Sequence, residues 1–213
     1  MTPRSERSDQ ASSGSPNATG VECQGGDPAD ARDPEIDAEV AAIHDEVAEA
    51  VRAAAPLCLA SGQCCRFREN RIRLEATGIE ACRCLLLTVA SGRGIGHADL
   101  DQAIEAGTCP WNIDRLCVAR EARPSGCRVY YCDPRAKELV PKLQQHAMDR
   151  LQAIHVRHRL VWAFGEWRGM LRGVMLVAEA DGLLSLPTAP SANGGPGRSR
   201  SAGRGLDLHP NSR

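Results

Sequence analysis

The side chains of this sequence best suited to chemistry are cysteines in three short, turn-rich segments, "CLASGQCC", "GTCPWNIDRLC" and "ARPSGCRVYYC". These cysteines are Cys58, Cys64, Cys65, Cys109, Cys117, Cys127 and Cys132. Closely spaced thiols in irregular backbone suit a metal, because tetrahedral ligation brings four sulfur atoms to about 2.3 Å from zinc, and iron–sulfur clusters use the same ligand type. We therefore predict that these side chains form a pool of ligands for zinc or iron.

Two of these cysteines, Cys64 and Cys65, are adjacent. Neighbouring side chains point in different directions in most backbone conformations, so we do not expect both thiols to bind one ion without strain. The pair would more readily bridge two metals, or place one thiol on a metal and the other beside it. The pool also exceeds the four thiols of one tetrahedral site. At least one metal is predicted, and two adjacent metals or a cluster stay open.

The other cysteines and two histidines lie outside the three cysteine-rich segments. On a predicted helix, Cys82 and Cys84 lie about 200° apart and cannot both face one metal. Cys82 falls on the apolar stripe and is expected in the core, whereas the role of Cys84 stays open; Cys23, in a segment poor in bulky apolar residues, is not expected to be a ligand. His155 and His158 share a helix face and could add nitrogen ligands or lie in the core.

Four arginines are interleaved with the thiols: Arg66, Arg115, Arg123 and Arg128. Four thiolates around a divalent metal leave a net charge of about −2. Nearby guanidinium groups would offset this charge and donate hydrogen bonds to sulfur. The alternative is that each of these arginines lies on the solvated surface.

The bulk composition bears on compartment and partners. Residues 1–30 contain no apolar run of about 7 to 15 residues, and no stretch elsewhere reaches the roughly 18 apolar residues of a membrane span. We expect a cytoplasmic protein without a membrane partner, in which thiols stay reduced; disulfides and metal-free buried thiols are the alternatives. A net charge of −1 makes nucleic acid an unfavoured partner, and no protein partner is indicated.

The 213 residues are 42% hydrophobic but only 3% aromatic, so metal cross-links would help a core built from small aliphatic side chains. We expect one domain over residues 33–186, with a motif core at 57–133 and C-terminal helices at 134–180. Residues 1–32 and 187–213 contain few bulky apolar groups and are expected to be disordered tails.

The expected fold class is mainly α, with helices flanking an irregular, metal-organised cysteine core and at most a short β-hairpin, at Trp111 to Val118. Asp33 and Pro34 can begin a helix that ends before Pro56. Further helices are expected from about 76 to 90, over 98–107, and after Pro134, where Pro141 should kink the helix or mark its true start. The aromatic side chains expected as core anchors are Trp162, Phe164 and Trp167.

The cysteine segments resemble those of the YkgJ family of zinc- or iron-chelating domains. The first motif is matched by Cys58, Gly62, Cys64 and Cys65; the later motifs are matched by Cys109, Pro110, Cys117, Val118, Arg123, Pro124, Cys127, Arg128, Tyr130 and Cys132. The resemblance covers about residues 57–133 and implies metal chelation by the matched cysteines. Trp111 and Ala119 depart from the pattern, and Ala119, at a position where an aromatic residue or histidine often stands, implies a more open site.

The first functional hypothesis is a cytoplasmic metal-binding protein that chelates zinc or iron. The alternative is an iron–sulfur redox protein or oxidoreductase component. A third hypothesis is a thiol-based redox switch without metal. No Ser/His/Asp or Cys/His arrangement supports a nucleophile, so no catalytic residue is predicted. Zinc and iron both accept four thiolates, and the sequence does not separate them.

Overall fold

The computed structural model describes residues 30–58, 61–131, 133–183 and 185–186. The fold is mainly helical, which confirms the predicted fold class. The elements are η1 (Asp30–Arg32), α1 (Pro34–Ala54), η2 (Gln63–Cys65), α2 (Phe67–Asn70), β1 (Glu75–Thr77), α3 (Gly78–Ala90), α4 (His97–Ala106), β2 (Asn112–Ile113), β3 (Leu116–Cys117), η3 (Arg120–Ala122), α5 (Ser125–Val129), η4 (Pro134–Ala136), α6 (Leu139–His158), β4 (Phe164–Glu166) and α7 (Trp167–Ala180).

Helix α1 begins as its sequence predicts. The Asp33 side chain accepts a hydrogen bond from the N–H of Glu35 at 2.8 Å, and Pro34 occupies the first helical position. This satisfies a donor that the first turn of a helix otherwise leaves free. One face of the helix is buried through its branched aliphatic side chains Ile36, Val40, Ile43, Val47 and Val51.

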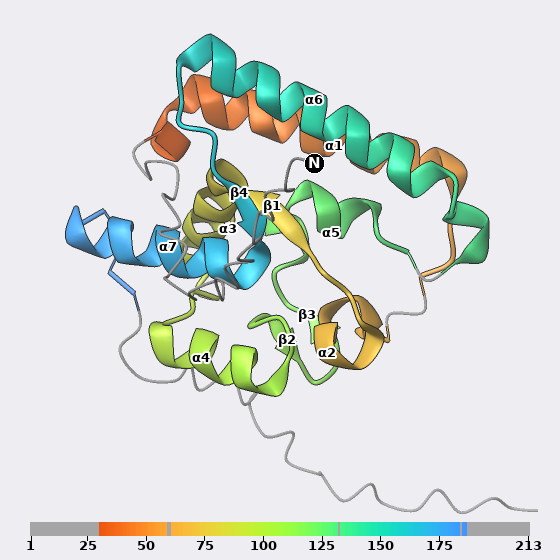
Figure 1. The fold of residues 1–213 in the computed structure, drawn as a ribbon, viewed down its shortest axis with the longest axis horizontal. Helices are drawn as coiled ribbons and strands as arrows, with labels where there is room; N and C mark the ends of the chain where they lie inside the picture. Colours follow the sequence, from red (N-terminus) through yellow and green to blue (C-terminus); the bar gives the residue numbers. More distant parts are fainter. Residues whose placement is uncertain (1–29, 59–60, 132, 184, 187–213) are drawn as a thin grey trace, which may run out of the picture.

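Helices α1 and α6 lie side by side along one edge of the molecule (Figure 1). They run antiparallel, because Glu39 of α1 pairs with His158 at the end of α6, whereas Glu46 pairs with His146 nearer its start. Pro141 lies in the first turn of α6, where its missing N–H costs nothing. Of the two predicted roles, a kink or the start of the helix, Pro141 therefore has the second.

Two strand–helix units form the middle of the fold. Strand β1 leads directly into α3, strand β4 leads into α7, the strands pair antiparallel, and α3 packs against α7 (Figure 1). Thr77 and Glu80 form a capping box for α3, and Glu166 caps α7. This pairing was not predicted, and α3 begins two residues later than expected because residues 75–77 form the strand.

The predicted hairpin is present. Strands β2 and β3 pair antiparallel with Asn112 opposite Cys117, and the turn residues Asp114 and Arg115 have φ angles of 47° and 66°. A two-residue turn with both φ angles positive matches the right-handed twist of the strands it joins.

The aromatic side chains divide between core and surface. Trp111 and Trp167 are buried with ring centroids 6.0 Å apart, so the prediction for Trp167 is confirmed. Trp162 and Phe164 are 41% and 40% exposed and stack on each other, so the prediction that they anchor the core is wrong. They lie in and just before the short edge strand β4, which turns them outward.

The chain ends are only partly described. The predicted tails fall mostly on residues 1–29 and 187–213, outside the described residues. The described fold begins slightly before the predicted boundary, because residues 30–32 form η1 and Ala31 is buried. None of the described helices is both long enough and apolar enough to cross a membrane.

Candidate metal centre

One cavity of about 290 Å³ is lined by cysteines from separate segments of the chain. The cysteines that line it are Cys64, Cys65, Cys84, Cys109, Cys117 and Cys127. They come from η2, α3, the loop between α4 and β2, β3 and α5. Five of them belong to the predicted pool, and the fold brings these together although they span residues 64–127.

Gly62 joins the first cysteine segment to the hairpin. Its φ of +66° begins the turn that holds Cys64 and Cys65, and a Cβ at this position would lie 2.1 Å from the carbonyl oxygen of Arg115. Next to this contact, the N–H of Cys109 donates to the carbonyl of Cys65 at 2.8 Å. Backbone contacts therefore hold these segments together independently of any interaction between the thiols.

A buried carboxylate, Glu80, positions the other side of the cavity. Its Oε1 accepts a hydrogen bond from the N–H of Ser125 at 2.7 Å and lies 3.3 Å from Nε2 of His44. Its Oε2 accepts from the N–H and hydroxyl of Thr77 at 3.1 and 2.9 Å. Glu80 thus ties α1, α3 and α5 together; it lies one turn before Cys84, and its partner Ser125 lies two residues before Cys127.

Glu80 is a positioning residue that sequence reasoning missed, whereas Cys84, whose role the sequence left open, lines the cavity and is a candidate ligand. The "TGIE" pattern before an apolar run is a capping-box signal and could have pointed to Glu80. No comparable signal singles out Cys84. Cys82 is buried in the core away from this cavity, as predicted.

The sulfur atoms gather around Cys65. Its Sγ lies 4.0 Å from that of Cys64, and Cys65 also interacts through its thiol with Cys109 and Cys117. Tetrahedral thiolate ligation places sulfur atoms about 3.8 Å apart. The adjacent pair can therefore span one ion, which differs from the expectation of strain, because the 3-10 turn after Gly62 brings the two thiols together.

The cluster is nevertheless more open than a closed tetrahedral site. Among the described residues, no three cysteine sulfur atoms lie within 4.8 Å of one another. A bound metal would therefore have to draw at least one of the neighbouring thiols inward. Cys117 ends a two-residue strand and Cys127 lies in a five-residue helix, short elements that small shifts can adjust.

The thiols of Cys64 and Cys117 have lowered pKa values, which favour their negatively charged form. The hydrogen bond with Cys65, aided by the charge of Arg123, lowers the pKa of Cys64 to about 6, and the interaction with Cys65 lowers the pKa of Cys117 to about 7. The interaction with Cys109, followed by those with Cys117 and Cys64, raises the pKa of Cys65. Metal ligation by Cys65 would therefore release a proton.

The thiols of Cys84 and Cys127 have raised pKa values instead. Burial, followed by the charges of neighbouring thiols, raises the pKa of Cys84 and of Cys127. These two side chains also need a cation in the cavity before they can ionise at neutral pH.

Two of the four predicted arginines act on the thiols. Arg123 lines the cavity and its charge acts on Cys64, Cys117 and Cys127, while the charge of Arg128 acts on Cys84. Arg66 instead pairs with Glu69 at 2.7 Å. Arg115 lies in the hairpin turn and lines a neighbouring cavity.

That neighbouring cavity, of about 270 Å³, contains the exposed Cys58. Cys64 and Cys117 line both cavities, so Cys58 lies on the outer side of the same cluster. Cys132 and Cys23 lie outside the described residues. None of the described cysteines forms a disulfide.

The rest of the cavity wall is largely apolar and aromatic, with Phe67, Trp111, Trp167 and Ala119. The indole Nε1 of Trp167 is buried and has no acceptor among the described residues. A buried donor without a partner is costly, and a metal-bound sulfur is an acceptor that could satisfy it. Thiols as metal ligands, and an indole N–H that can donate a hydrogen bond to a metal-bound sulfur, therefore fit a thiolate-bound metal.

The two predicted histidines do not join the cysteines. Nδ1–H of His155 donates to the carbonyl of Leu151 at 2.8 Å, and its ring packs edge-on against Trp162. His158 pairs with Glu39 at 2.9 Å. Neither lines the cysteine cavity.

The chain matches no protein-family model, no curated protein and no solved structure. The resemblance to YkgJ-type domains rests on the cysteine motifs alone. Functional inference must therefore come from the site itself.

Proposed function

We propose that this chain is a metal-binding protein of a reducing compartment, the cytoplasm, and that it chelates zinc or iron through its cysteine cluster. The ligand pool is Cys58, Cys64, Cys65, Cys109, Cys117, Cys127 and Cys132, to which we add Cys84. The observation that carries the proposal is the convergence of six thiols from separate elements on one cavity.

The chemistry of the cavity favours a soft or borderline metal. Thiolate ligands select zinc, copper(I) and iron–sulfur clusters over hard cations such as magnesium. Arg123 beside the thiols offsets part of the thiolate charge, as a thiolate-bound metal requires. The similarity to YkgJ-type motifs adds support for zinc or iron.

A second candidate, an iron–sulfur redox protein, is favoured by three features. The cavity holds more thiols than one tetrahedral zinc needs, and buried tryptophans line it. Burial and solvent exclusion are among the properties that tune the reduction potential of iron–sulfur clusters. The cavity volume of about 290 Å³ also exceeds the space of a single ion.

Metal content and visible absorption of protein purified without oxygen and without an affinity tag test both candidates. Stoichiometric zinc without colour supports the chelating module, whereas iron with inorganic sulfide and brown colour supports the redox protein. Cys64→Ser and Cys127→Ser should each lower the bound metal. Metal-free protein with fully titratable thiols would exclude both and leave a thiol redox switch.

A further inference from the structure

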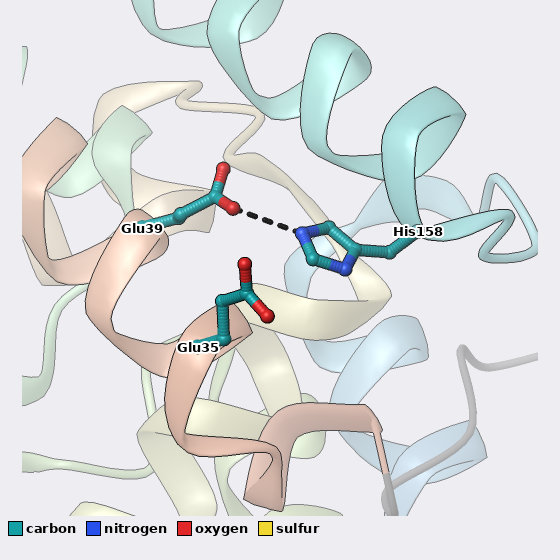
Figure 2. Close-up of side chains that lie close together, drawn as sticks. All are labelled: Glu35, Glu39 and His158. Atoms are coloured by element: carbon teal, nitrogen blue, oxygen red, sulfur yellow. Dashed lines mark hydrogen bonds and ion pairs between the residues drawn. The ribbon is translucent and has the colours of Figure 1, made fainter.

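A second set of potential metal ligands lies between α1 and α6. Glu35 and Glu39 are one helical turn apart on α1, and His158 is the last residue of α6. Figure 2 shows the two carboxylates and the imidazole facing one space between the helices. None of the three lines the cysteine cavity.

The geometry of this set is close to that of a metal site. One ligand atom from each residue lies within 4.8 Å of the others, and Nε2 of His158 is 2.9 Å from Oε1 of Glu39. Ligand atoms bound to zinc at about 2.0–2.2 Å lie roughly 3.3 Å apart. Closure therefore requires only modest side-chain movement, with Nε2 exchanging its hydrogen bond to Glu39 for the metal and the ring proton moving to Nδ1.

Both carboxylate oxygens of Glu39 are paired, Oε1 with Nε2 of His158 and Oε2 with the guanidinium of Arg157, which donates a hydrogen bond to it. A bound ion would replace the contact with His158, and Glu35 would supply the second carboxylate. Glu39 and His158 are partly shielded, with side chains 24% and 17% exposed, whereas Glu35 is exposed. Glu35 and Glu39 line a groove of about 440 Å³ together with Arg150 and Arg157, and this groove opens the carboxylate side of the set to solvent.

The same two helices provide an internal comparison. His146 and Arg150 of α6 pair with Glu46 of α1 at 3.1 and 2.8 Å. This set of three residues has only one carboxylate, Glu46. Among the described residues, neither Glu46 nor His146 belongs to a group of three close ligand atoms. The second carboxylate, Glu35, is what distinguishes the site near the helix ends.

We propose that Glu35, Glu39 and His158 form a binding site for Zn²⁺ that clamps the beginning of α1 to the end of α6. One imidazole and two carboxylates suit zinc better than magnesium or calcium, which prefer oxygen ligands alone. Three protein ligands leave a position for water. The proposal does not rest on metal binding by the cysteines.

Calorimetric titration of Zn²⁺ into the full chain, after its as-purified metal content has been measured and loosely bound metal removed, tests the site. Wild type and His146→Ala should each bind one further Zn²⁺ per chain. Glu35→Gln should weaken this binding by about tenfold or more, and His158→Ala should abolish it. Glu35 is exposed, so its substitution keeps the test independent of folding.

Excess Zn²⁺ should also raise the thermal midpoint of wild type more than that of Glu35→Gln. Equal affinity of wild type and Glu35→Gln, or no further Zn²⁺ bound by wild type, would overturn the site. The as-purified metal content of the same samples reports the cysteine cluster separately, so failure of one proposal is distinguishable from failure of the other.

Discussion

Gly62 is the residue at which the first cysteine segment meets the hairpin. Its positive φ is natural for glycine, and the carbonyl of Arg115 occupies the space that a side chain would need. Gly62→Ala should lower the free energy of unfolding by about 2–4 kcal/mol and reduce bound metal, because Cys64, Cys65 and Cys117 would move apart. Denaturant unfolding and metal analysis of the variant measure both effects.

Gly92→Ala is the matched control. Gly92 has a similar φ of +69° but nothing within 4 Å of the position of a Cβ. This variant should lose only about 1 kcal/mol, from the backbone conformation, and keep its metal. Equal losses in both variants would show that the contact with Arg115 does not matter.

At the scale of elements, Glu80 joins three helices through hydrogen bonds to Thr77, His44 and Ser125. Glu80→Gln keeps the size of the side chain but replaces one accepting oxygen with a donor. It should lower the free energy of unfolding by about 1–3 kcal/mol at pH 7. The exposed carboxylate Glu49 provides the control, since Glu49→Gln should change stability by less than about 0.5 kcal/mol.

The same contact predicts how stability depends on pH. Burial lowers the pKa of His44 below its ordinary value of 6.5; burial would raise the pKa of Glu80, but the hydrogen bonds from His44 and Ser125 outweigh it and lower that pKa below 4.5. Both groups therefore bind fewer protons in the folded protein than in the unfolded chain. The free energy of unfolding should fall as pH decreases below about 6.5, and again below about 4.5.

Denaturant unfolding from pH 8 to pH 3 measures this dependence. In Glu80→Gln the loss below pH 4.5 should be smaller than in wild type, because the carboxylate has been removed. A wild-type stability that stays constant from pH 7 to pH 5 would contradict the account of His44.

Local elements were predictable and distant pairings were not. The start of α1 and the β2–β3 hairpin depend on neighbouring residues, namely Asp33 with Pro34 and the turn at Asp114 and Arg115. The β1–β4 pair joins Glu75 to Glu166 and has no local signal. The orientation of Cys84 depends on how α3 packs against α7, so the periodicity of α3 alone could not place this thiol in the cavity.

The spacing of Cys64 and Cys65 was missed for a related reason. Most backbone conformations separate adjacent side chains, but the left-handed Gly62 starts a tight turn that brings these sulfur atoms to 4.0 Å. The cysteine pool itself was visible from residue type and spacing. Its three-dimensional arrangement required the fold.

At the scale of the whole molecule, a core with few aromatic side chains would gain stability from additional cross-links. The proposed metal joins η2, α3, β3 and α5. Removing it with a chelator under reducing conditions should lower the stability by about 3 kcal/mol and the thermal midpoint by roughly 10 °C. Restoring the metal should reverse the change, and an unaltered midpoint after complete removal would argue against a structural role.

The central claim is that the thiols lining the cavity bind the metal. The most direct measurement is metal content per chain for wild type, Cys84→Ser and Cys82→Ser, purified in parallel without oxygen. The two cysteines lie on the same helix and are both buried, but only Cys84 lines the cavity. We predict that Cys84→Ser lowers the bound metal while Cys82→Ser retains it. Wild-type metal content in both variants, or equal loss from both, would contradict the assignment of this cavity as the metal centre.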